Sequence, residues 1–555
     1  MADENRIIHT FPQETYPHWY SSETGIYRSK QAPMDLPTDP FVDVVSFLFS
    51  HQHNGVSAFI DSSSGFSISY SKLFPLVKSM ASGLHKMGVS KGDVVLLLIP
   101  NSIYYPVVFL GVLYLGAIVT PLNPISSFSE IRKQIVDSGV SLAFTIPENI
   151  KKLQPLGIPI IEVPENVKDL KHVAFSVFQN LISGSFDLLM RPVITQEDTA
   201  AIMYSSGTTG VSKGVVLTHQ NFISAVQLFV RFEASQYEYS SLNNVYLAVL
   251  PMFHIYGLSL LSTGLMSLGS TVIVMRKFDI NEVVEAIDKY KVTHFPVVPP
   301  MLIALTKRGK SINGSSLQSL IQVSCGAATL SRKFIEDFVQ TLPTVDFIQG
   351  YGMTETTAVG TRGFNTEKFR NYSSIGLLAP NMEAKVVHWQ TGAHMPPGSS
   401  GELWLRGPAI MRGYLNNEEA TMSTIDKDGW LHTGDIVHFD QDGYLHMSER
   451  LKDIVKYKGF QIAPADLEAV LILHPEIVDV AVTSAIDEET GEIPVAFVVR
   501  KDGSVLSEAA IMDYVAKQVA PYRKIRKVFF TDSIPRSAAG KILRRNLRNS
   551  LVSKL

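Results

Sequence analysis

Apolar and polar positions alternate along the first two thirds of the chain between short hydrophobic runs and longer amphipathic stretches. Continuous apolar runs occur at residues 94–99 (VVLLLI), 200–204 (AAIMY) and 270–275 (STVIVM). Runs of this length are typical of strands buried on both faces. The stretch at 281–292 (NEVVEAIDKYKV) has the spacing of a helix with one apolar face. Strands that alternate with helices predict an α/β body with mainly parallel strands.

One apolar segment is long enough to raise the question of a membrane span. Residues 94–129 carry no charged side chain. A span needs roughly 20 consecutive apolar residues. Polar Asn101 and Asn123 lie inside the segment, and four prolines interrupt it: Pro100, Pro106, Pro121 and Pro124. We therefore expect a core strand followed by a buried helix, and no transmembrane segment.

The pattern changes after about residue 380. Residues 391–413 are rich in glycine, proline and serine, and the pairs Asp428-Gly429 and Asp442-Gly443 follow between short alternating segments. Asp-Gly pairs tolerate positive φ and favour tight hairpins. This region predicts a small antiparallel β subdomain.

From about residue 453 the pattern predicts a compact α+β unit. The charged segment at 448–453 (SERLKD) joins this unit to the larger body. The expected elements are a helix at 463–474, strands at 478–486 and 495–500, and a helix at 507–520 with Ser507 as its cap.

Composition narrows the class of protein. The 555 residues are 45% hydrophobic and 18% charged, which is typical of a globular protein. The net charge of −3 gives no basic excess for a nucleic acid or a lipid surface. Cys325 is the single cysteine, so an intramolecular disulfide and a thiolate-rich metal site are excluded. Its small apolar neighbours favour a core residue over a nucleophile.

The two ends of the sequence suggest a destination in the cell. The first ten residues, MADENRIIHT, lack the layout of a signal peptide. The tripeptide Ser553-Lys554-Leu555 matches an address that the peroxisomal import receptor reads. We expect import into the peroxisome.

The segment SSGTTGVSKG at residues 205–214 is the strongest chemical signal in the sequence. It follows an apolar run and precedes an expected helix capped by Thr218. Backbone amides and hydroxyls of such a loop can bind phosphate oxygens, and Lys213 adds positive charge. The spacing GxxxxGK[ST] of P-loop NTPases is absent. An ordinary surface turn is the alternative for a short Ser/Gly segment.

This segment resembles the phosphate-binding signature of the acyl-adenylate-forming (AMP-binding) superfamily. Further motifs of that family follow in its order: QGYGMTE (349–355), GELWLRG (401–407), HTGD (432–435), ERLKDIVKYKGFQIAP (449–464) and PRSAAGKILRR (535–545). The segments PMFHIYG (251–257) and KYKGFQIAPADLE (456–468) most resemble the plant 4-coumarate:CoA ligase branch.

The resemblance implies a fold and a reaction. The expected fold is α/β, with a large N-terminal domain of stacked mixed sheets, helices and a small β subdomain at residues 1–451. A smaller, mobile α+β C-terminal domain follows at 452–555, with its hinge at Lys452. The implied enzyme is a monomeric acid–thiol ligase that uses ATP, Mg²⁺ and CoA. It converts a carboxylic acid to an acyl-adenylate and then to a CoA thioester.

The resemblance also assigns the nucleotide site, position by position. In QGYGMTE, Gln349 and Gly350 would belong to the nucleotide site and Tyr351 would stack on adenine. Thr354 would bond the α-phosphate. Glu355 would hold Mg²⁺, and Asp435 with Arg450 would bind the ribose. The turn Gly326-Ala327-Ala328 would face adenine and the acyl pocket. The ATP phosphates would be held by Ser205, Ser206, Gly207, Thr208, Thr209, Gly210 and Lys213.

The second group of implied residues serves the chemistry and CoA. Lys541 would reach the α-phosphate and the attacking carboxylate, where a positioned ammonium stabilises developing charge. Lys456 and Gln461 would contact the adenylate. His254 would stand between the acyl pocket and the pantetheine channel, and Tyr256 would line the acyl pocket. The implied CoA contacts are Lys458, Gly459 and Lys277.

The sequence departs from the 4-coumarate ligase pattern at several positions. Val211-Ser212 replaces Leu-Pro, residues 356–359 read TTAV, and Leu260 stands where the ligases often have serine. We therefore expect a less polar acyl pocket that takes fatty acids, oxylipin precursors of jasmonate or cinnamic-type acids, with the first two favoured. Three alternatives stay open: a luciferase-like oxygenase, an adenylation enzyme that loads a carrier protein, and a non-catalytic binding protein.

Overall fold

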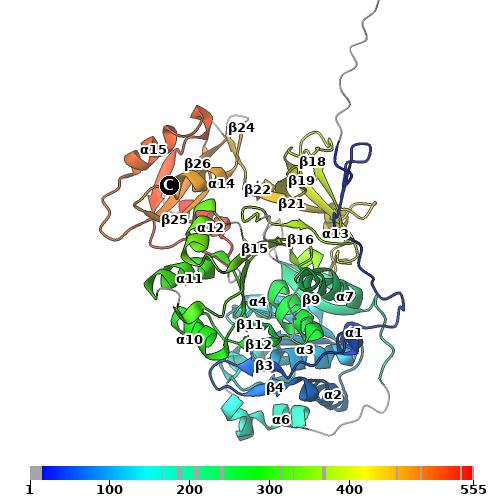
Figure 1. The fold of residues 1–555 in the computed structure, drawn as a ribbon. Helices are drawn as coiled ribbons and strands as arrows, with labels where there is room; N and C mark the ends of the chain where they lie inside the picture. The colour runs from blue at the N-terminus through cyan, green and yellow to red at the C-terminus, as the bar shows by residue number, and fades with distance from the viewer. Residues whose placement is uncertain are drawn as a thin grey trace, which may run out of the picture.

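The computed structural model describes residues 16–165, 167–183, 191–205, 212–237, 243–312, 315–328, 330–365, 370–457, 460–487, 491–537 and 540–552. Within these residues the strands form four sheets. Three sheets build the large body, which occupies the lower and right parts of Figure 1, and the fourth belongs to the C-terminal unit at the upper left. The mixed α/β fold class expected from the sequence is confirmed.

Two large mixed sheets form the centre of the body. The first has the order β20 (Gly413–Tyr414), β10 (Lys213–Thr218), β9 (Thr199–Ser205), β6 (Ile118–Pro121), β5 (Val94–Leu98), β7 (Val140–Thr145) and β8 (Ile160–Glu162). The second has the order β17 (Leu377–Leu378), β16 (Thr361–Arg362), β15 (Asp346–Tyr351), β14 (Gln322–Cys325), β13 (His294–Val297), β11 (Val245–Ala248), β12 (Thr271–Val274), β3 (Ser57–Asp61) and β4 (Ser67–Ser69).

The uncharged segment at 94–129 is a core strand and a buried helix, as expected. All five residues of β5 are buried, and α3 (Tyr105–Tyr114) is buried from Tyr105 through Leu113. No helix in the described part of the chain has the length and apolar character to cross a membrane.

Helices cover the two central sheets. The amphipathic stretch near 281–292 forms α10 (Ile280–Tyr290), whose Val283, Val284 and Ile287 are buried. The Asp279 side chain caps this helix by accepting hydrogen bonds from two backbone amides. The remaining helices of the body are α1 (Val44–Ser50), α2 (Tyr70–Lys86), α4 (Phe128–Ser138), α5 (Ile150–Leu153), α6 (Ser176–Ser183), α7 (His219–Ala225), α8 (Phe232–Ser235), α9 (Ile255–Gly257), α11 (Pro299–Ser311), α12 (Arg332–Thr341) and α13 (Glu418–Thr424).

The expected antiparallel subdomain is the third sheet of the body. Its order is β1 (Tyr20–Ser21), β2 (Ile26–Arg28), β18 (Glu383–Val387), β19 (Gly401–Arg406), β21 (Leu431–Phe439) and β22 (Leu445–Arg450). The Asp442-Gly443 pair turns the hairpin between β21 and β22, with φ of +81° at Gly443. The Asp428-Gly429 pair instead makes a turn that closes a single bridge between Ile425 and Leu431.

In its described residues, the C-terminal unit has one separate sheet and three α-helices. Its strands are β24 (Phe460–Ile462), β23 (Val455–Tyr457), β26 (Gly491–Arg500), β25 (Ile477–Asp487) and β27 (Lys527–Phe530). Its helices are α14 (Pro464–Leu471), α15 (Glu508–Ala516) and α16 (Arg544–Val552). The Ser507 hydroxyl caps α15 by accepting from the Ala510 amide, as the sequence predicts.

The C-terminal unit contacts the body above α11 and α12 in Figure 1. Lys333 of α12 donates a 2.9 Å hydrogen bond to the Ile472 carbonyl, and Phe334 packs against the apolar core of the unit. A Cβ on Gly540 would approach Val298 and Pro300 at the start of α11 within 3.0–3.2 Å. The loop that carries Lys541 therefore lies directly on the body.

Candidate active site

The site forms where several strands of the body end. β14 ends at Cys325 and leads into Gly326, and β15 ends at Tyr351. Ala327, Thr357 and Ala358 around these ends have left-handed backbones with φ of 69°, 52° and 67°. Non-glycine residues rarely adopt this conformation, and when they do they cluster at functional sites.

Asp435 is a fully buried carboxylate on β21 that Tyr351 and Arg450 position. The Tyr351 phenol donates a 2.7 Å hydrogen bond to Oδ2, and Nε of Arg450 lies 3.0 Å from Oδ1. The Arg450 contact is an ion pair without hydrogen-bond geometry, since Oδ1 has no hydrogen-bond donor among the described residues. A buried carboxylate oxygen with spare accepting capacity suits the ribose hydroxyls that the family resemblance implies.

Glu355 and Ser205 are joined by a hydrogen bond. The Ser205 hydroxyl donates to Glu355 Oε1 at 2.8 Å, and the Tyr414 hydroxyl donates to the same oxygen at 3.0 Å. Lys213 pairs with Ser205 across β10 and β9, and its ammonium lies 4.8 Å from the Tyr414 ring centroid. The sequence did not single out Tyr414, which positions Glu355 from β20. Ser206, Gly207, Thr208, Thr209 and Gly210 lie outside the described residues.

Lys541 is held in a tight loop beside other cations. Its backbone amide donates to Ser537 Oγ at 3.2 Å, and its carbonyl accepts from the Ser537 amide at 2.8 Å. Burial, followed by the charges of Arg450 and Lys452, lowers the pKa of the Lys541 ammonium to about 7. Asp435 and Asp453 oppose this shift. Arg450 is ion-paired with Asp435, and the charges of Lys541 and Lys452 act on this region, so the cluster can hold a polyanion.

Three other residues of the QGYGMTE motif, Gln349, Gly350 and Thr354, shape the backbone around the site. The Gln349 amide donates to the backbone carbonyls of Tyr372 and Ser374 at 2.9 and 3.3 Å, so it fixes a neighbouring loop. Gly350 lies against Arg362. Thr354 begins the short helix η10 (Thr354–Thr356) that carries Glu355.

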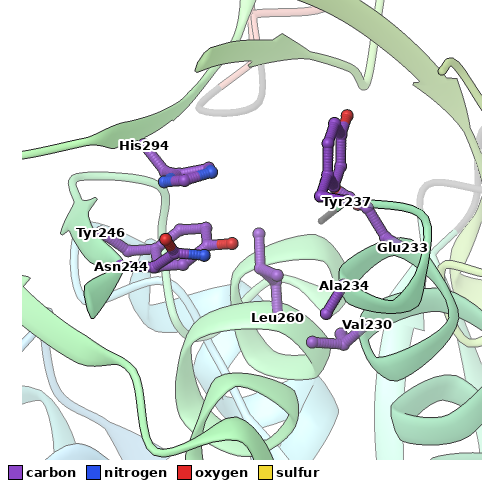
Figure 2. A pocket seen from close by; sticks show the side chains of 8 residues that line it. All are labelled: Val230, Glu233, Ala234, Tyr237, Asn244, Tyr246, Leu260 and His294. Carbon is purple, nitrogen blue, oxygen red and sulfur yellow. The ribbon is translucent and has the colours of Figure 1, made fainter. Parts of the chain in front are cut away.

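Two of the expected acyl-pocket residues, Tyr256 and Gly326, lie in contact. Tyr256 of α9 is 3.4 Å from Ser324 Oγ, and a Cβ on Gly326 would touch its ring at 3.4 Å. Leu260 lies in η7 (Leu258–Thr263) and lines a pocket, which is drawn in Figure 2. The pocket also carries polar side chains, among them Glu233, Tyr237, Asn244 and His294. Polar side chains therefore lie beside Leu260 in this pocket.

His254 and Cys325 flank this region as uncharged groups. Burial lowers the pKa of His254 to about 4, so its imidazole is neutral at physiological pH. Burial raises the pKa of the Cys325 thiol to about 12, so it stays protonated. The interpretation of Cys325 as a core residue is confirmed, because the side chain is buried.

The residues expected to serve CoA are only partly placed. Lys452 lies in η11 (Leu451–Asp453), and Lys456 is exposed on β23 opposite Gln461 of β24. The Gln461 side chain, Lys458 and Gly459 lie outside what the structure describes. Lys277 is exposed after β12, next to Arg276, which pairs with Glu165.

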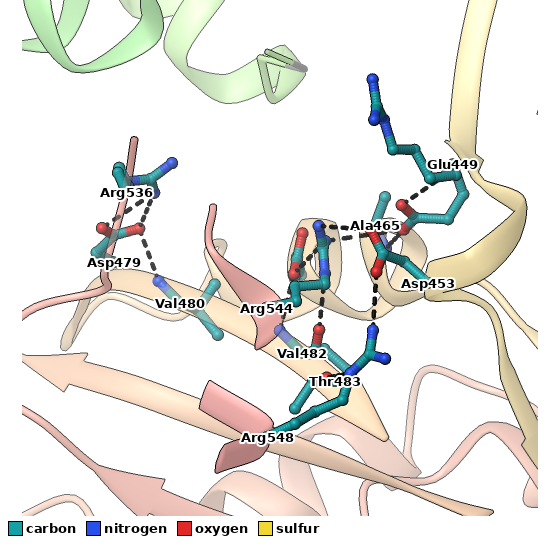
Figure 3. Close-up of polar contacts among 12 residues, drawn as sticks. Glu449, Asp453, Ala465, Asp479, Val480, Val482, Thr483, Arg536, Arg544 and Arg548 are labelled. Atoms are coloured by element: carbon teal, nitrogen blue, oxygen red, sulfur yellow. Dashed lines mark hydrogen bonds and ion pairs between the residues drawn. The ribbon is translucent and has the colours of Figure 1, made fainter. Parts of the chain in front are cut away.

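A network of charged side chains joins the body to the C-terminal unit (Figure 3). Glu449 of β22 accepts a 2.7 Å hydrogen bond from the Ala465 amide at the start of α14 and lies 3.8 Å from Arg544. Arg544 also pairs with Glu468 at 2.7 Å, and Arg548 pairs with Asp453 at 2.8 Å. Sequence reasoning treated Glu449 as part of a charged linker and missed this role.

The residues present fit a nucleotide with one Mg²⁺. No group of three metal-type side chains occurs among the described residues. Mg²⁺ bound with phosphates commonly uses only one or two protein carboxylates. Glu355, beside Ser205, can supply one such carboxylate. The positive charges of Lys213, Arg450 and Lys541 and the acceptor Asp435 Oδ1 are of the kinds that a nucleotide needs.

Comparisons with known proteins match most of the chain to one family of nucleotide-binding enzymes. Residues 49–415 match the family model described as "AMP-binding enzyme", and residues 466–541 match "AMP-binding enzyme C-terminal domain". The chain is 59% identical to 4-coumarate–CoA ligase-like 6 of Arabidopsis thaliana over 541 residues, which cover 97% of this chain and 96% of that protein. It is 45% identical to peroxisomal OPC-8:0-CoA ligase 1 of the same plant, over 95% and 96% of the two chains.

Solved structures agree in fold over most of the chain. ATP-bound MatB from Rhodopseudomonas palustris has a TM-score of 0.83 and 25% identity, and the match covers 92% of this chain and 98% of that one. The Bacillus subtilis o-succinylbenzoate CoA synthetase in complex with ATP and magnesium has a TM-score of 0.77 and 26% identity, with 91% and 99% covered.

Proposed function

The chain belongs to the AMP-binding enzyme family, and from this we propose that it activates a fatty, oxylipin or cinnamic-type acid and transfers the acyl group to CoA in the peroxisome. It is an acid–thiol ligase that uses ATP, Mg²⁺ and CoA. The convergence of Lys541, Arg450 and Lys452 beside Asp435 is the observation that carries the proposal. This cluster combines cations that can bind phosphates with a carboxylate, Asp435, that can accept hydrogen bonds from hydroxyl groups.

In the first step a carboxylate oxygen of the substrate attacks the α-phosphorus of ATP. A new oxygen–phosphorus bond forms, and the bond to pyrophosphate breaks. The two reactants are both anions, so Lys541 and Arg450 act by stabilising the charge that develops as they approach. Lys213 would attract the phosphates towards β9 and β10, and Glu355 would hold the Mg²⁺, which would supply charge neutralisation to the phosphates.

In the second step the CoA sulfur attacks the acyl carbonyl and AMP leaves. His254 would lie between the acyl pocket and the CoA channel. Because its pKa is lowered to about 4, its imidazole is uncharged during this step. We assign Lys452 as the hinge between residues 1–451 and 452–555. Rotation about this hinge would remove Lys541 and bring Lys458-Gly459, together with Lys456 and Gln461, towards the adenylate.

One pocket residue and one relative support the proposed class of acid. Buried Leu260 presents hydrocarbon where a ligase for hydroxycinnamic acids often has serine. One relative at 45% identity is named a peroxisomal OPC-8:0-CoA ligase. These features favour fatty and oxylipin acids over cinnamic-type acids. The tripeptide Ser553-Lys554-Leu555, outside the described residues, supports peroxisomal import, and a fluorescent fusion with and without it tests this.

A panel of acids tests the proposed function. Purified protein is mixed with ATP, Mg²⁺, CoA and each acid in turn, and AMP release and acyl-CoA are measured. We expect both products with at least one medium- or long-chain acid, and none without CoA. Pyrophosphate exchange without thioester formation on CoA would instead favour an adenylation enzyme that loads a carrier protein. Light from luciferin and oxygen would favour a luciferase-like activity, and no exchange with any acid would indicate a binding protein.

A further inference from the structure

A buried side-chain amide, Asn101, joins the two central sheets of the body. It follows β5 of the first sheet and is 6% exposed. In the sequence it is one of two asparagines in the uncharged segment 94–129. Buried polar groups are retained where their hydrogen bonds are made. The nucleotide site and the hinge do not use Asn101, so its role lies elsewhere.

Both the amino group and the carbonyl group of the Asn101 side chain bind backbone atoms of the second sheet's loops. Nδ2 donates to the carbonyls of Leu250 at 2.9 Å, Met275 at 3.3 Å and Val249 at 3.4 Å. Oδ1 accepts from the Met252 amide at 2.8 Å. One side chain that follows a strand of the first sheet thus holds two separate segments of the second.

The two segments leave neighbouring parallel strands. Residues 249–252 follow β11, and Met275 follows β12, which pairs with β11 in parallel. The Met275 amide also donates to the Ala248 carbonyl at 3.0 Å. Ligands of α/β sheets commonly bind beyond the carboxyl ends of such strands. Asn101 therefore fixes two loops at an edge where a ligand is expected.

The first segment leads directly into the residues expected beside the acyl pocket and the CoA channel. The His254 amide donates to the Pro251 carbonyl at 3.1 Å, and α9 with Tyr256 follows. Gly257 lies so close to the Pro251 carbonyl that a Cβ on it would collide with that group. Because the turn is packed this tightly, a shift of Met252 would be passed on to His254.

The second segment leads to a cation that is expected to contact CoA. Lys277 lies two residues after Met275 and is exposed. Arg276, between them, pairs with Glu165. The Asn101 amide holds the Met275 carbonyl, and this fixes the point from which the exposed cations leave the sheet.

We propose that Asn101 is a positioning residue for CoA, which holds the segments of His254 and Lys277 in the arrangement that the thioester step requires. This inference rests on the proposed function and adds a residue that acts only in its second step. Asn101 acts through the backbone of the two loops. Its four hydrogen bonds lead to neither β15 nor β21, which carry the nucleotide site, so adenylation should depend little on it.

The test measures KM for CoA separately from adenylation in Asn101→Leu, which nearly keeps the side-chain volume and removes all four hydrogen bonds. With the acid that the native enzyme activates best, we expect KM for CoA to rise about tenfold, and pyrophosphate exchange without CoA to stay within about twofold. Asn101→Asp keeps an acceptor for the Met252 amide but loses the amide donors, and we expect a rise of about threefold. Asn101→Asp carries the same test if Asn101→Leu does not fold.

Gln196→Met is the matched control. The Gln196 side chain is 7% exposed, and its Nε2 donates to the carbonyls of Pro37 and Asp39 at 2.9 and 2.7 Å, in a region without an expected CoA residue. We expect its melting temperature to fall, as that of Asn101→Leu does, because both variants lose a buried amide that binds backbone carbonyls. Its KM for CoA should stay unchanged.

An unchanged KM for CoA in Asn101→Leu, at a lowered melting temperature, would show that Asn101 only joins the sheets and would overturn the inference. The same rise in KM for CoA in Gln196→Met would also overturn it. So would a loss of pyrophosphate exchange in Asn101→Leu as large as its loss of thioester formation. Failure of every acid to release AMP from the native enzyme would instead overturn the proposed function.

Discussion

The Tyr351 phenol donates a 2.7 Å hydrogen bond to Oδ2 of Asp435, whose side chain is fully buried. This bond fixes the carboxylate, while Oδ1 has no hydrogen-bond donor in the described part of the chain. A buried acceptor of this kind is costly unless a ligand supplies the missing donor. The relationship therefore supports our proposal that Asp435 binds the nucleotide, with Tyr351 as the residue that positions its carboxylate.

Asp435→Asn should weaken ATP binding more than it slows the chemistry. The amide retains one acceptor but loses the charge, and a hydrogen bond to a charged group contributes about 1.5–3 kcal/mol. We expect the KM for ATP in pyrophosphate exchange to rise about tenfold or more, and Tyr351→Phe to give a smaller rise. Asp440→Asn is the control, because Asp440 pairs with His446 in the same sheet but outside the site. An unchanged KM for ATP would contradict the assignment.

Lys541→Ala should separate the two half-reactions. The Lys541 ammonium lies in the cationic cluster that we propose serves adenylation, and the thioester step is assigned to the rotated arrangement without it. We expect acyl-adenylate formation to slow by at least about 100-fold, which is typical for loss of an electrostatic catalytic group. Thioester formation from supplied acyl-adenylate should change little. Equal loss of both rates in stopped-flow measurements would show that the assignment is wrong.

The pH dependence of adenylation offers a separate test of Lys541. Its pKa is lowered to about 7, so in the free enzyme the ammonium loses its proton as pH rises through 7. Since the charged form is the active one, kcat/KM for ATP should fall above this pH. Bound phosphates favour the charged form and should move the corresponding limb of kcat to higher pH. Lys541→Arg stays protonated, and its profile should lack this limb.

Elements set by local pattern were predictable from the sequence. The apolar run at 94–99 became β5, and Ser507 caps α15, because burial and capping are encoded by neighbouring residues. The family motifs likewise located Asp435, Tyr351 and Lys541, which the structure brings to one region.

Partners that are distant in sequence were not predictable. Arg362 and Glu233 are 129 residues apart, and each lies in a short element without a motif. Glu449 is one residue from Arg450, yet the strand pleat directs it towards Arg544 and α14 instead of the nucleotide site. Periodicity identifies a buried face, but it does not identify the residue on the other side of that face.

Leu260→Ser should shift the acid preference and lower stability. Leu260 is 3% exposed in the acyl-pocket wall, and replacing a buried leucine by a small residue costs about 2–5 kcal/mol. We expect KM for unsubstituted fatty acids to rise about tenfold, with a smaller change for hydroxycinnamic acids. Leu265→Ser, at a fully buried position that does not line the pocket, should lower the melting temperature without changing the preference. The same shift in both variants would contradict the role of Leu260.

The contacts of Glu449 cross the assigned hinge. Glu449 precedes Lys452 and belongs to β22 of the body, whereas Ala465 and Arg544 follow it and belong to the C-terminal unit. Rotation about Lys452 must break the 2.7 Å hydrogen bond to the Ala465 amide and separate Glu449 from Arg544. These contacts therefore stabilise the arrangement in which the charge of Asp435 acts on Lys541.

Glu449→Ala should slow adenylation while the thioester step keeps its rate or becomes faster. The change removes the contact that favours the adenylating arrangement and shifts the population towards the rotated one. We expect a decrease of about threefold to tenfold in single-turnover acyl-adenylate formation. Asp479→Asn is the matched control, because Asp479 pairs with Arg536 at 2.9 Å within the C-terminal unit and its contact does not cross the hinge (Figure 3). Equal slowing of both steps in Glu449→Ala, or of adenylation in both variants, would show that the network supports folding alone.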